Sequence, residues 1–361
     1  MGGESGATLL SARRDPRAKG RHLQACLSDE VEYRRSTGLE RFELRNRALP
    51  ETALHGVDLS TRLLGRRIPL PLMIAPMTGG DPRAHGINRR LARAAQRWGL
   101  PMGVGSQRVG IEDPGRARYF QVRAEAPSIL LFANIGGAQL VKGWGLEQAM
   151  QAVEMIGADA LFVHLNPMQE AVQGGDADFR GLAGRLQELC RGLHEEGIPV
   201  FAREVGFGLG EGTCRRLRAC GVDGIDCAGA GGTSWARVEA ACARGERAQA
   251  LAMAFAEWGI PTAQSIRNCR RASPTVPLIA SGGLRSGLDL AKAIALGADL
   301  GAMARPFLVA AEAGDAALDA LVEGVMSELR VALFAAGAAD LPALRGALSP
   351  VAGAWGEPGA E

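Results

Sequence analysis

The chain has 361 residues, of which 47% are hydrophobic and 22% are charged. This composition supports a large buried core and excludes a globally disordered chain. The formal net charge of +2 argues against a dedicated polyanion-binding protein but is compatible with a local basic pocket. Seven cysteines without a CxxC pair, and no apolar run of membrane-spanning length, predict a soluble cytoplasmic protein with reduced thiols.

Both ends of the chain differ in composition from its centre. Residues 1–16 and 349–361 are rich in Gly, Pro, Ala and charged residues, and we expect mobile tails there. Residues 17–68 predict an N-terminal extension that packs on the domain or acts as a lid. Helical patterns at 87–99 and 287–298 separate strand-like runs. Eight such apolar runs lie at residues 70–77, 101–106, 128–136, 160–165, 199–205, 224–229, 277–283 and 300–308.

This alternation of eight strands with helices over about 240 residues predicts a (β/α)₈ TIM barrel. A doubly wound sheet is the alternative, but polar and glycine motifs follow nearly every strand instead of a single switch point. In a barrel these strand ends converge on one mouth. We therefore expect a single domain over residues 17–348.

A polar cluster follows the fourth strand-like run. His164, Asn166, Gln169 and Glu170 come directly after the apolar residues 160–163. In a buried parallel strand, polar side chains begin where the strand ends. The cluster therefore predicts the floor of a site that could hold a substrate, orient a proton and bind one hard cation. A solvated strand-to-helix turn is the alternative.

Glycine-rich segments follow the last two strands. SGGLRSGLDL begins at residue 281, and GAMARPF covers 301–307. Glycines let backbone N–H groups approach a phosphate, and a helix N-terminus adds a favourable dipole. The loops after strands seven and eight form the common phosphate site of TIM barrels. Further hydrogen-bonding motifs at other strand ends suit a flat flavin nucleotide: MTGG (77–80), GSQR (105–108), ANIGG (133–137), REVGFG (203–208) and GAGGTSW (229–235).

The combined motifs resemble the type 2 isopentenyl diphosphate isomerases, from about residue 17 to 347. That resemblance implies a flavoprotein of isoprenoid biosynthesis, which interconverts isopentenyl and dimethylallyl diphosphate with FMN, Mg²⁺ and NADPH as flavin reductant. It also implies a homo-oligomer, either a tetramer or an octamer. The matching segments are PMTGG (76–80), VGSQR (104–108), NIGG (134–137), HLNPMQE (164–170), EVGFG (204–208), DCAGAGGTSW (226–235), WGIPTA (258–263), SGGLRSGLDLAKAIALGA (281–298) and ARPFL (304–308).

The resemblance also implies roles for individual residues. Gln169, His164 and Asn166 are the expected catalytic residues, and Glu170 is the expected Mg²⁺ ligand. The substrate would contact Lys19, His22, Ser106, Arg108 and Gln169, with His164 also at the diphosphate. FMN would be held by Pro76, Met77, Thr78, Ser106, Asn134, Arg203, Ala228, Thr233, Gly283, Leu284, Arg285 and the backbone of Ala304 and Arg305.

Three departures from the family pattern affect this site. Ala18 stands where the family has arginine, and Arg203 stands where it has lysine. Gln173–Asp176 is one residue and one carboxylate shorter than the corresponding family segment. These departures keep open a family member that acts on another prenyl diphosphate. An FMN-dependent oxidoreductase of the 2-hydroxy acid oxidase type is a further alternative, disfavoured because residues 224–235 lack the histidine base of that class.

Overall fold

The computed structural model describes residues 18–175 and 177–351. Eight parallel strands form a closed barrel in the order β10-β11-β4-β5-β6-β7-β8-β9. Barrel closure confirms the predicted TIM barrel and excludes the doubly wound sheet. Each predicted run contains one of these strands, whose bounds are β4 Leu72–Ile74, β5 Met102–Gly103, β6 Leu131–Gly136, β7 Ala160–Leu165, β8 Val200–Glu204, β9 Gly224–Asp226, β10 Leu278–Ala280 and β11 Leu300–Met303.

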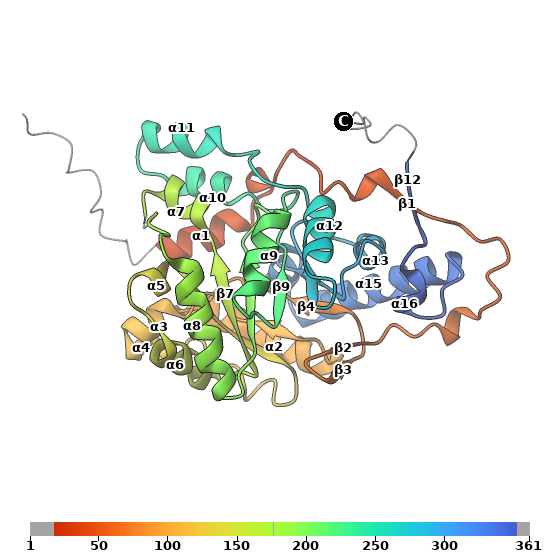
Figure 1. Cartoon of the computed structure of the whole chain (residues 1–361), viewed down its shortest axis with the longest axis horizontal. Helices are drawn as coiled ribbons and strands as arrows, with labels where there is room; N and C mark the ends of the chain where they lie inside the picture. The colour runs from red at the N-terminus through yellow and green to blue at the C-terminus, as the bar shows by residue number, and fades with distance from the viewer. Residues whose placement is uncertain (1–17, 176, 352–361) are drawn as a thin grey trace, which may run out of the picture.

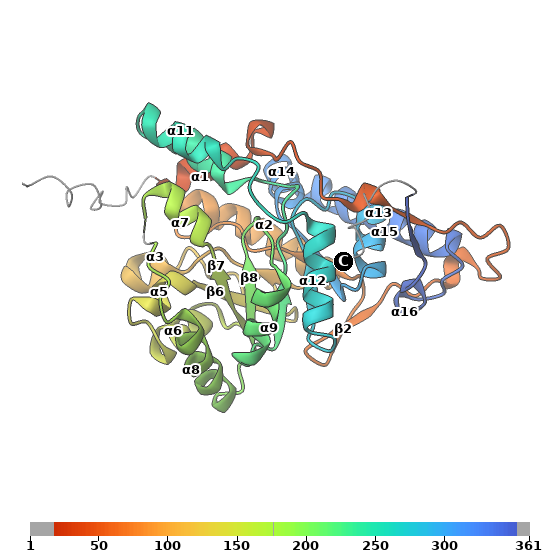
Figure 2. The same cartoon turned by 45° about the horizontal axis from the view of Figure 1, so that its top comes forward.

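Helices surround the barrel and also gather over one of its ends (Figure 1). In both views α1, α7 and α11 lie together at that end, whereas the β2–β3 hairpin lies at the opposite end (Figure 2). The helices are α1 Ala18–Cys26, α2 Pro82–Trp98, α3 Arg108–Glu112, α4 Pro114–Ala117, α5 Gly137–Val141, α6 Leu146–Ile156, α7 Pro167–Gln173, α8 Leu182–Glu195, α9 Glu211–Ala219, α10 Trp235–Cys242, α11 Glu246–Ala254, α12 Thr262–Ala272, α13 Gly287–Ala295, α14 Arg305–Ala313, α15 Asp315–Ala335 and α16 Leu341–Leu344. Within the described residues, none of these helices combines the length and apolarity needed to cross a membrane.

Local capping sets the ends of the two helices expected from sequence. Helix α2 begins before the expected residue 87, because the Asp81 side chain accepts a hydrogen bond from the Ala84 amide and Pro82 occupies the first turn. It ends at Gly99, which takes a left-handed conformation with φ of 64°. Helix α13 starts as expected behind the Ser286 cap. It ends before the expected residue 298.

Three aromatic rings fill the interior of the barrel. Phe132, Phe162 and Phe201 come from the neighbouring strands β6, β7 and β8, and all three are fully buried. The Phe132 and Phe162 rings stack with centroids 4.7 Å apart, and Phe201 meets Phe132 edge-on at 5.3 Å. Gly224 on β9 makes room for them, since a Cβ there would lie 1.9 Å from the Phe201 ring. The interior is therefore a packed core below the mouth.

The N-terminal extension packs against distant parts of the chain. Helix α1 contacts α10, and the Tyr33 hydroxyl donates to the backbone oxygens of Gly206 and Trp258. Strand β1 (Phe42–Leu44) pairs antiparallel with β12 (Leu348–Pro350), while β2 (Thr61–Leu63) and β3 (Arg66–Ile68) form a hairpin. The expected C-terminal tail therefore starts too early at residue 349. The rest of both expected tails lies almost entirely outside the described residues.

Candidate active site at the mouth of the barrel

A cavity of about 1670 Å³ opens at the carboxyl ends of the strands. The segments that follow all eight strands contribute to its walls, and α1 adds Arg21 and His22. The predicted site residues with described side chains all line this cavity: His22, Pro76, Met77, Thr78, Ser106, Arg108, Asn134, His164, Asn166, Gln169, Glu170, Arg203, Ala228, Thr233, Gly283, Leu284, Arg285, Ala304 and Arg305. The side chain of Lys19 lies outside the described part of the chain.

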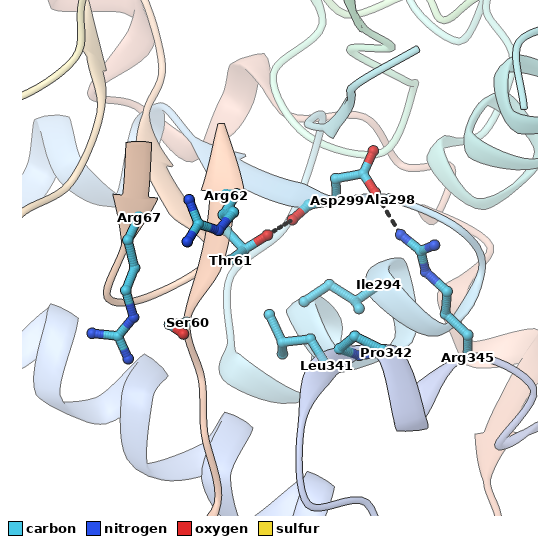
Figure 3. A pocket seen from close by; sticks show the side chains of 10 residues that line it. All are labelled: Ser60, Thr61, Arg62, Arg67, Ile294, Ala298, Asp299, Leu341, Pro342 and Arg345. Carbon is cyan, nitrogen blue, oxygen red and sulfur yellow. Dashed lines mark hydrogen bonds and ion pairs between the residues drawn. The ribbon is translucent and has the colours of Figure 1, made fainter. Parts of the chain in front are cut away.

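A second cavity, whose lining side chains Figure 3 shows, has a volume of about 440 Å³. Ala298 and Asp299 line it just before β11 begins, so it lies at the end of the barrel opposite the mouth. It is lined by the residues just before β11, by the start of β2 and by α16. Its arginines already have partners: Arg345 pairs with Asp299, Arg67 pairs with Asp58, and Arg62 donates to a backbone carbonyl. Catalytic groups of TIM barrels lie at the carboxyl ends of the strands. The larger cavity is therefore the candidate active site.

The polar cluster after β7 forms one connected wall of the larger cavity. Pro167 starts α7, so Asn166, Gln169 and Glu170 fall on one face of its first turn. The Asn166 amide nitrogen donates to Gln169 Oε1 at 3.1 Å and to Glu170 Oε1 at 3.3 Å. Its Oδ1 is buried and has no hydrogen-bond partner within the described chain. A buried acceptor of this kind at a cavity wall indicates a place for a ligand donor.

Glu239 extends this wall and was not predicted from the sequence. It lies on α10, is 6% exposed, and accepts a hydrogen bond from Gln169 Nε2 at 2.9 Å. Its second oxygen lies 3.2 Å from His22 Nε2 on α1. From sequence alone, a single glutamate in a short helix is expected to face solvent. Glu239 reaches the site only because α10 packs against α1 and α7. Glu239 therefore holds two predicted site residues in fixed orientations.

The His164 ring is oriented by its neighbour on β6. The Asn134 amide nitrogen donates to the Val104 carbonyl at 3.1 Å, which directs its Oδ1 toward His164 Nδ1 at 2.8 Å. A carbonyl oxygen can only accept, so Nδ1 carries the proton. The other ring nitrogen, Nε2, can then accept a proton from a ligand, or donate one once the ring is charged.

The floor of the cavity contains a buried charged group. Arg203 on β8 lies with its Nε 3.3 Å from Asp226 Oδ2, and its guanidinium donates to the Pro76 carbonyl at 3.2 Å. The Ser281 hydroxyl donates to Asp226 Oδ1 at 2.5 Å. Burial raises the pKa of the Asp226 carboxyl, and the Arg203 charge opposes that rise. The Arg203 side chain is thus fixed by two partners at the floor of the cavity.

The backbones of the loops after β9 and β10 are in direct contact, without side chains between them. Gly282 and Gly283 have φ of 98° and 85°, and a Cβ at Gly283 would lie 2.4 Å from the Gly231 oxygen. Helix α14 begins behind Ala304, which has no capping side chain, and its first turn can offer the Arg305 and Phe307 amides to an anion, whereas Pro306 has no amide hydrogen. These features fit a phosphate, as the glycine motifs predicted.

Glu32 from the N-terminal extension bridges the same two loops. One carboxylate oxygen lies 2.7 Å from Arg285 and the other lies 2.8 Å from Arg305. Arg305 Nε also donates to the Cys26 carbonyl at the end of α1. Arg285 and Arg305 therefore bind the N-terminal extension to the loops that follow β10 and β11. Sequence patterns gave no indication of Glu32.

The shortened segment after the polar cluster closes α7. Gly174 takes a left-handed conformation with φ of 66°, and its amide donates to the Ala171 carbonyl. The Gly175 amide donates to the Glu170 carbonyl at 2.9 Å. The short segment therefore folds back on the turn that carries Glu170. Asp176 and the side chain of Ala18 lie outside the described residues.

The described part of the chain contains no metal site built from several side chains. In the described ranges, no three His, Cys, Asp or Glu residues are grouped so as to hold a metal ion. Glu170 is 5% exposed and lines the cavity, but it is not grouped with two further such side chains among the described residues. A cation here would therefore need waters or substrate oxygens for the rest of its shell.

The closed barrel, with Gly282, Gly283 and the start of α14 forming a cradle suited to a phosphate, is the arrangement expected of a flavin-binding TIM-barrel enzyme. In agreement, the model of the family described as FMN-dependent dehydrogenase matches residues 12–124 and 209–349. The chain belongs to the type 2 isopentenyl-diphosphate delta-isomerase family.

Two curated relatives illustrate the similarity on which this family assignment rests. The isopentenyl-diphosphate delta-isomerase of Synechococcus sp. is 50% identical over 339 residues, which cover 93% of this chain and 97% of the relative. That of Stutzerimonas stutzeri is 51% identical over 311 residues, or 86% and 89% of the two chains.

Solved structures show the same fold at much lower identity. A mandelate oxidase bound to (S)-2-phenylpropionate matches with a TM-score of 0.62 at 20% identity, covering 93% of this chain and 96% of the oxidase. An L230A flavocytochrome b2 with benzoylformate matches with a TM-score of 0.65 at 17% identity, covering 91% and 82% of the two chains. At these identities the likeness concerns the fold alone, so it lends no support to the oxidase alternative.

Proposed function

We propose that this protein interconverts isopentenyl diphosphate and dimethylallyl diphosphate, with FMN bound at the mouth of the barrel. One observation carries the proposal: the wall formed by Asn166, Gln169, Glu170 and Glu239 faces the same cavity as the glycine cradle after β9 and β10. A substrate held between them would contact polar groups on one side and a flavin on the other.

The FMN phosphate would bind at Gly283 and at the Arg305 and Phe307 amides in the first turn of α14. The flavin ring would lie across the floor near Arg203, with Met77, Thr78, Ser106 and the other predicted contacts around it. When bound and reduced by NADPH, FMN would supply a protonatable nitrogen and an electron-rich face beside the alkene.

The substrate diphosphate would lie toward His164, Arg108 and His22. Arg108 lines the cavity with its side chain 23% exposed, and arginine suits phosphate oxygens because it can donate two hydrogen bonds in parallel. Lys19 would add a further charge. Mg²⁺ would be held by Glu170, by phosphate oxygens and by water.

The isoprenoid carbons would lie against Gln169. Moving the double bond requires a proton to be added at one carbon and removed from another, and the cationic character in between must be kept from water. The Gln169 amide is held on one side by Asn166 and on the other by the Glu239 carboxylate. This orders the donor and acceptor ends of the amide and places a negative charge behind it.

The direct test is an anaerobic assay with FMN, NADPH, Mg²⁺ and isopentenyl diphosphate. We expect dimethylallyl diphosphate to form. If the flavin is bound and reduced and no dimethylallyl diphosphate appears, the proposed activity is wrong. In that case, longer prenyl diphosphates tested in the same assay would distinguish a redirected family member from an inactive scaffold.

The Glu170→Gln variant tests the metal site separately. We expect activity to fall to near background while FMN stays bound, because the amide is a far weaker ligand for a hard cation. Glu195→Gln, on the exposed end of α8, is the matched control and should be as active as the wild type. Loss of FMN from Glu170→Gln would show that Glu170 belongs to the flavin site instead.

We also propose that the protein assembles as a homo-oligomer, a tetramer or an octamer. Support comes from large apolar side chains exposed on and just after α11: Leu251 is 50%, Met253 43% and Trp258 58% exposed. Light scattering of the purified protein gives the molar mass. A single mass equal to one chain would contradict the proposal.

A further inference from the structure

Two buried cysteines meet between helices α9 and α12, away from the mouth of the barrel. Cys214 lies in the first turns of α9 and Cys269 near the end of α12, and each is at most 1% exposed. Their Sγ atoms are 2.8 Å apart. A disulfide bond is about 2.05 Å long, so little movement separates the two thiols from bonding. All seven cysteines are free in this structure.

Hydrogen bonds between the segment before α9 and helix α12 fix the positions of the two cysteines relative to each other. Ser265 Oγ accepts a hydrogen bond from the Leu209 amide at 2.7 Å, and Asn268 Nδ2 donates to the Leu209 carbonyl at 3.2 Å. These contacts hold the start of α9 against one side of α12. The two sulfur atoms therefore stay opposite each other in the folded protein.

We propose that Cys214 and Cys269 are a modification site, which peroxide-type oxidants convert to an intramolecular disulfide. The Cys214 thiolate attacks one peroxide oxygen, the O–O bond breaks, and a sulfenic acid and hydroxide result. The Cys269 sulfur then attacks the Cys214 sulfur, the S–O bond breaks, and hydroxide leaves. The two thiol protons neutralise the two hydroxides. Two thiols are oxidised, and one hydrogen peroxide is reduced to two waters.

The hydrogen bond between the two thiols favours this order of events. Either sulfur can donate in this hydrogen bond. With Cys269 as the donor, the bond lowers the pKa of Cys214 and raises that of Cys269. Cys214 also lies near the N-terminus of α9, where the helix dipole favours a thiolate. Cys214 is thus the attacking residue and Cys269 the resolving one.

The disulfide would join helices on either side of β9 without entering the active site. The two cysteines are 55 positions apart, and neither lines the cavity at the mouth. The Thr262 hydroxyl at the start of α12 donates to the carbonyls of Ala230 and Gly282, which belong to the loops of the phosphate cradle. We expect the oxidised protein to resist unfolding while its FMN site is unchanged.

The test uses the full-length flavoprotein, purified with a thiol reductant and freed of it. The protein is treated with a small excess of hydrogen peroxide, denatured, alkylated and digested without reduction. We expect a peptide pair joined through Cys214 and Cys269, loss of two of the seven alkylatable thiols, and recovery of both on reduction. The melting temperature should rise by a few degrees in the oxidised protein, and its FMN affinity should stay the same.

Two variants control this experiment. Cys214→Ala should abolish the joined peptide and leave Cys269 open to alkylation. Cys190→Ala, equally buried on α8, should still form it. If no joined Cys214–Cys269 peptide forms in the wild type, or if these residues oxidise only separately or with other cysteines, the proposal is wrong.

Discussion

Replacing Glu239 with glutamine tests whether its contacts with Gln169 and His22 are needed for the reaction. The carboxylate of Glu239 meets Gln169 Nε2 at 2.9 Å with one oxygen and His22 Nε2 at 3.2 Å with the other. Glutamine keeps one acceptor and turns an NH₂ group toward the second partner. At least one charge-assisted hydrogen bond is lost, which is worth about 1.5–3 kcal/mol. If that bond is present in the transition state, kcat/KM falls roughly 10- to 150-fold.

The assay compares initial rates of dimethylallyl diphosphate formation in the wild type and Glu239→Gln, with FMN reduced in both. FMN affinity should stay the same, because Glu239 contacts the polar wall and not the phosphate cradle. Glu154→Gln, on the exposed face of α6, is the control and should have wild-type rates. A fall of less than about threefold in Glu239→Gln, below 1 kcal/mol, would refute the argument that Glu239 orients Gln169 during the reaction.

Three further substitutions test other parts of the structure. Gly283→Ala should lower FMN affinity at least tenfold, about 1.4 kcal/mol, because its Cβ would meet the Gly231 oxygen; flavin fluorescence titration measures this, and unchanged affinity would contradict the cradle. Phe162→Ala should cost about 3–5 kcal/mol of unfolding free energy in urea titrations, since it empties the barrel interior; a loss under 1 kcal/mol would mean that the site collapses. Glu32→Gln should speed hydrogen exchange in residues 26–33, because the two arginines lose their shared carboxylate; exchange as slow as in the wild type would show that other contacts hold the extension.

The eight strands could be predicted because strands buried on both faces appear as short apolar runs. The run at 160–165 coincides with β7, but the other seven predicted runs were too long. The run at 70–77 contains only Leu72–Ile74 as a strand, and the residues after it turn to face the cavity. Sequence periodicity does not distinguish a residue in a strand from one that continues in the same direction beyond it.

The missed residues share a different physical cause. Glu239 meets Gln169 across 70 positions and His22 across 217, and Glu32 meets Arg305 across 273. Such contacts depend on how helices pack, which no local pattern encodes. The polar cluster from His164 to Glu170 could be predicted because its members lie within seven consecutive residues at the end of one apolar strand.

The pairing of strands at the two ends of the chain has a consequence for folding during synthesis. Strand β4 completes the barrel only with β11, where Leu72 meets Gly301, and β1 pairs with β12, where Leu44 meets Leu348. During synthesis from the N-terminus, β1 lacks its partner until nearly all the chain has emerged, and β4 can pair with β5 on one edge while its other edge waits for β11. Contacts between such distant segments slow folding and leave strand edges exposed. The early strands are therefore the region where a chaperone would have most to protect.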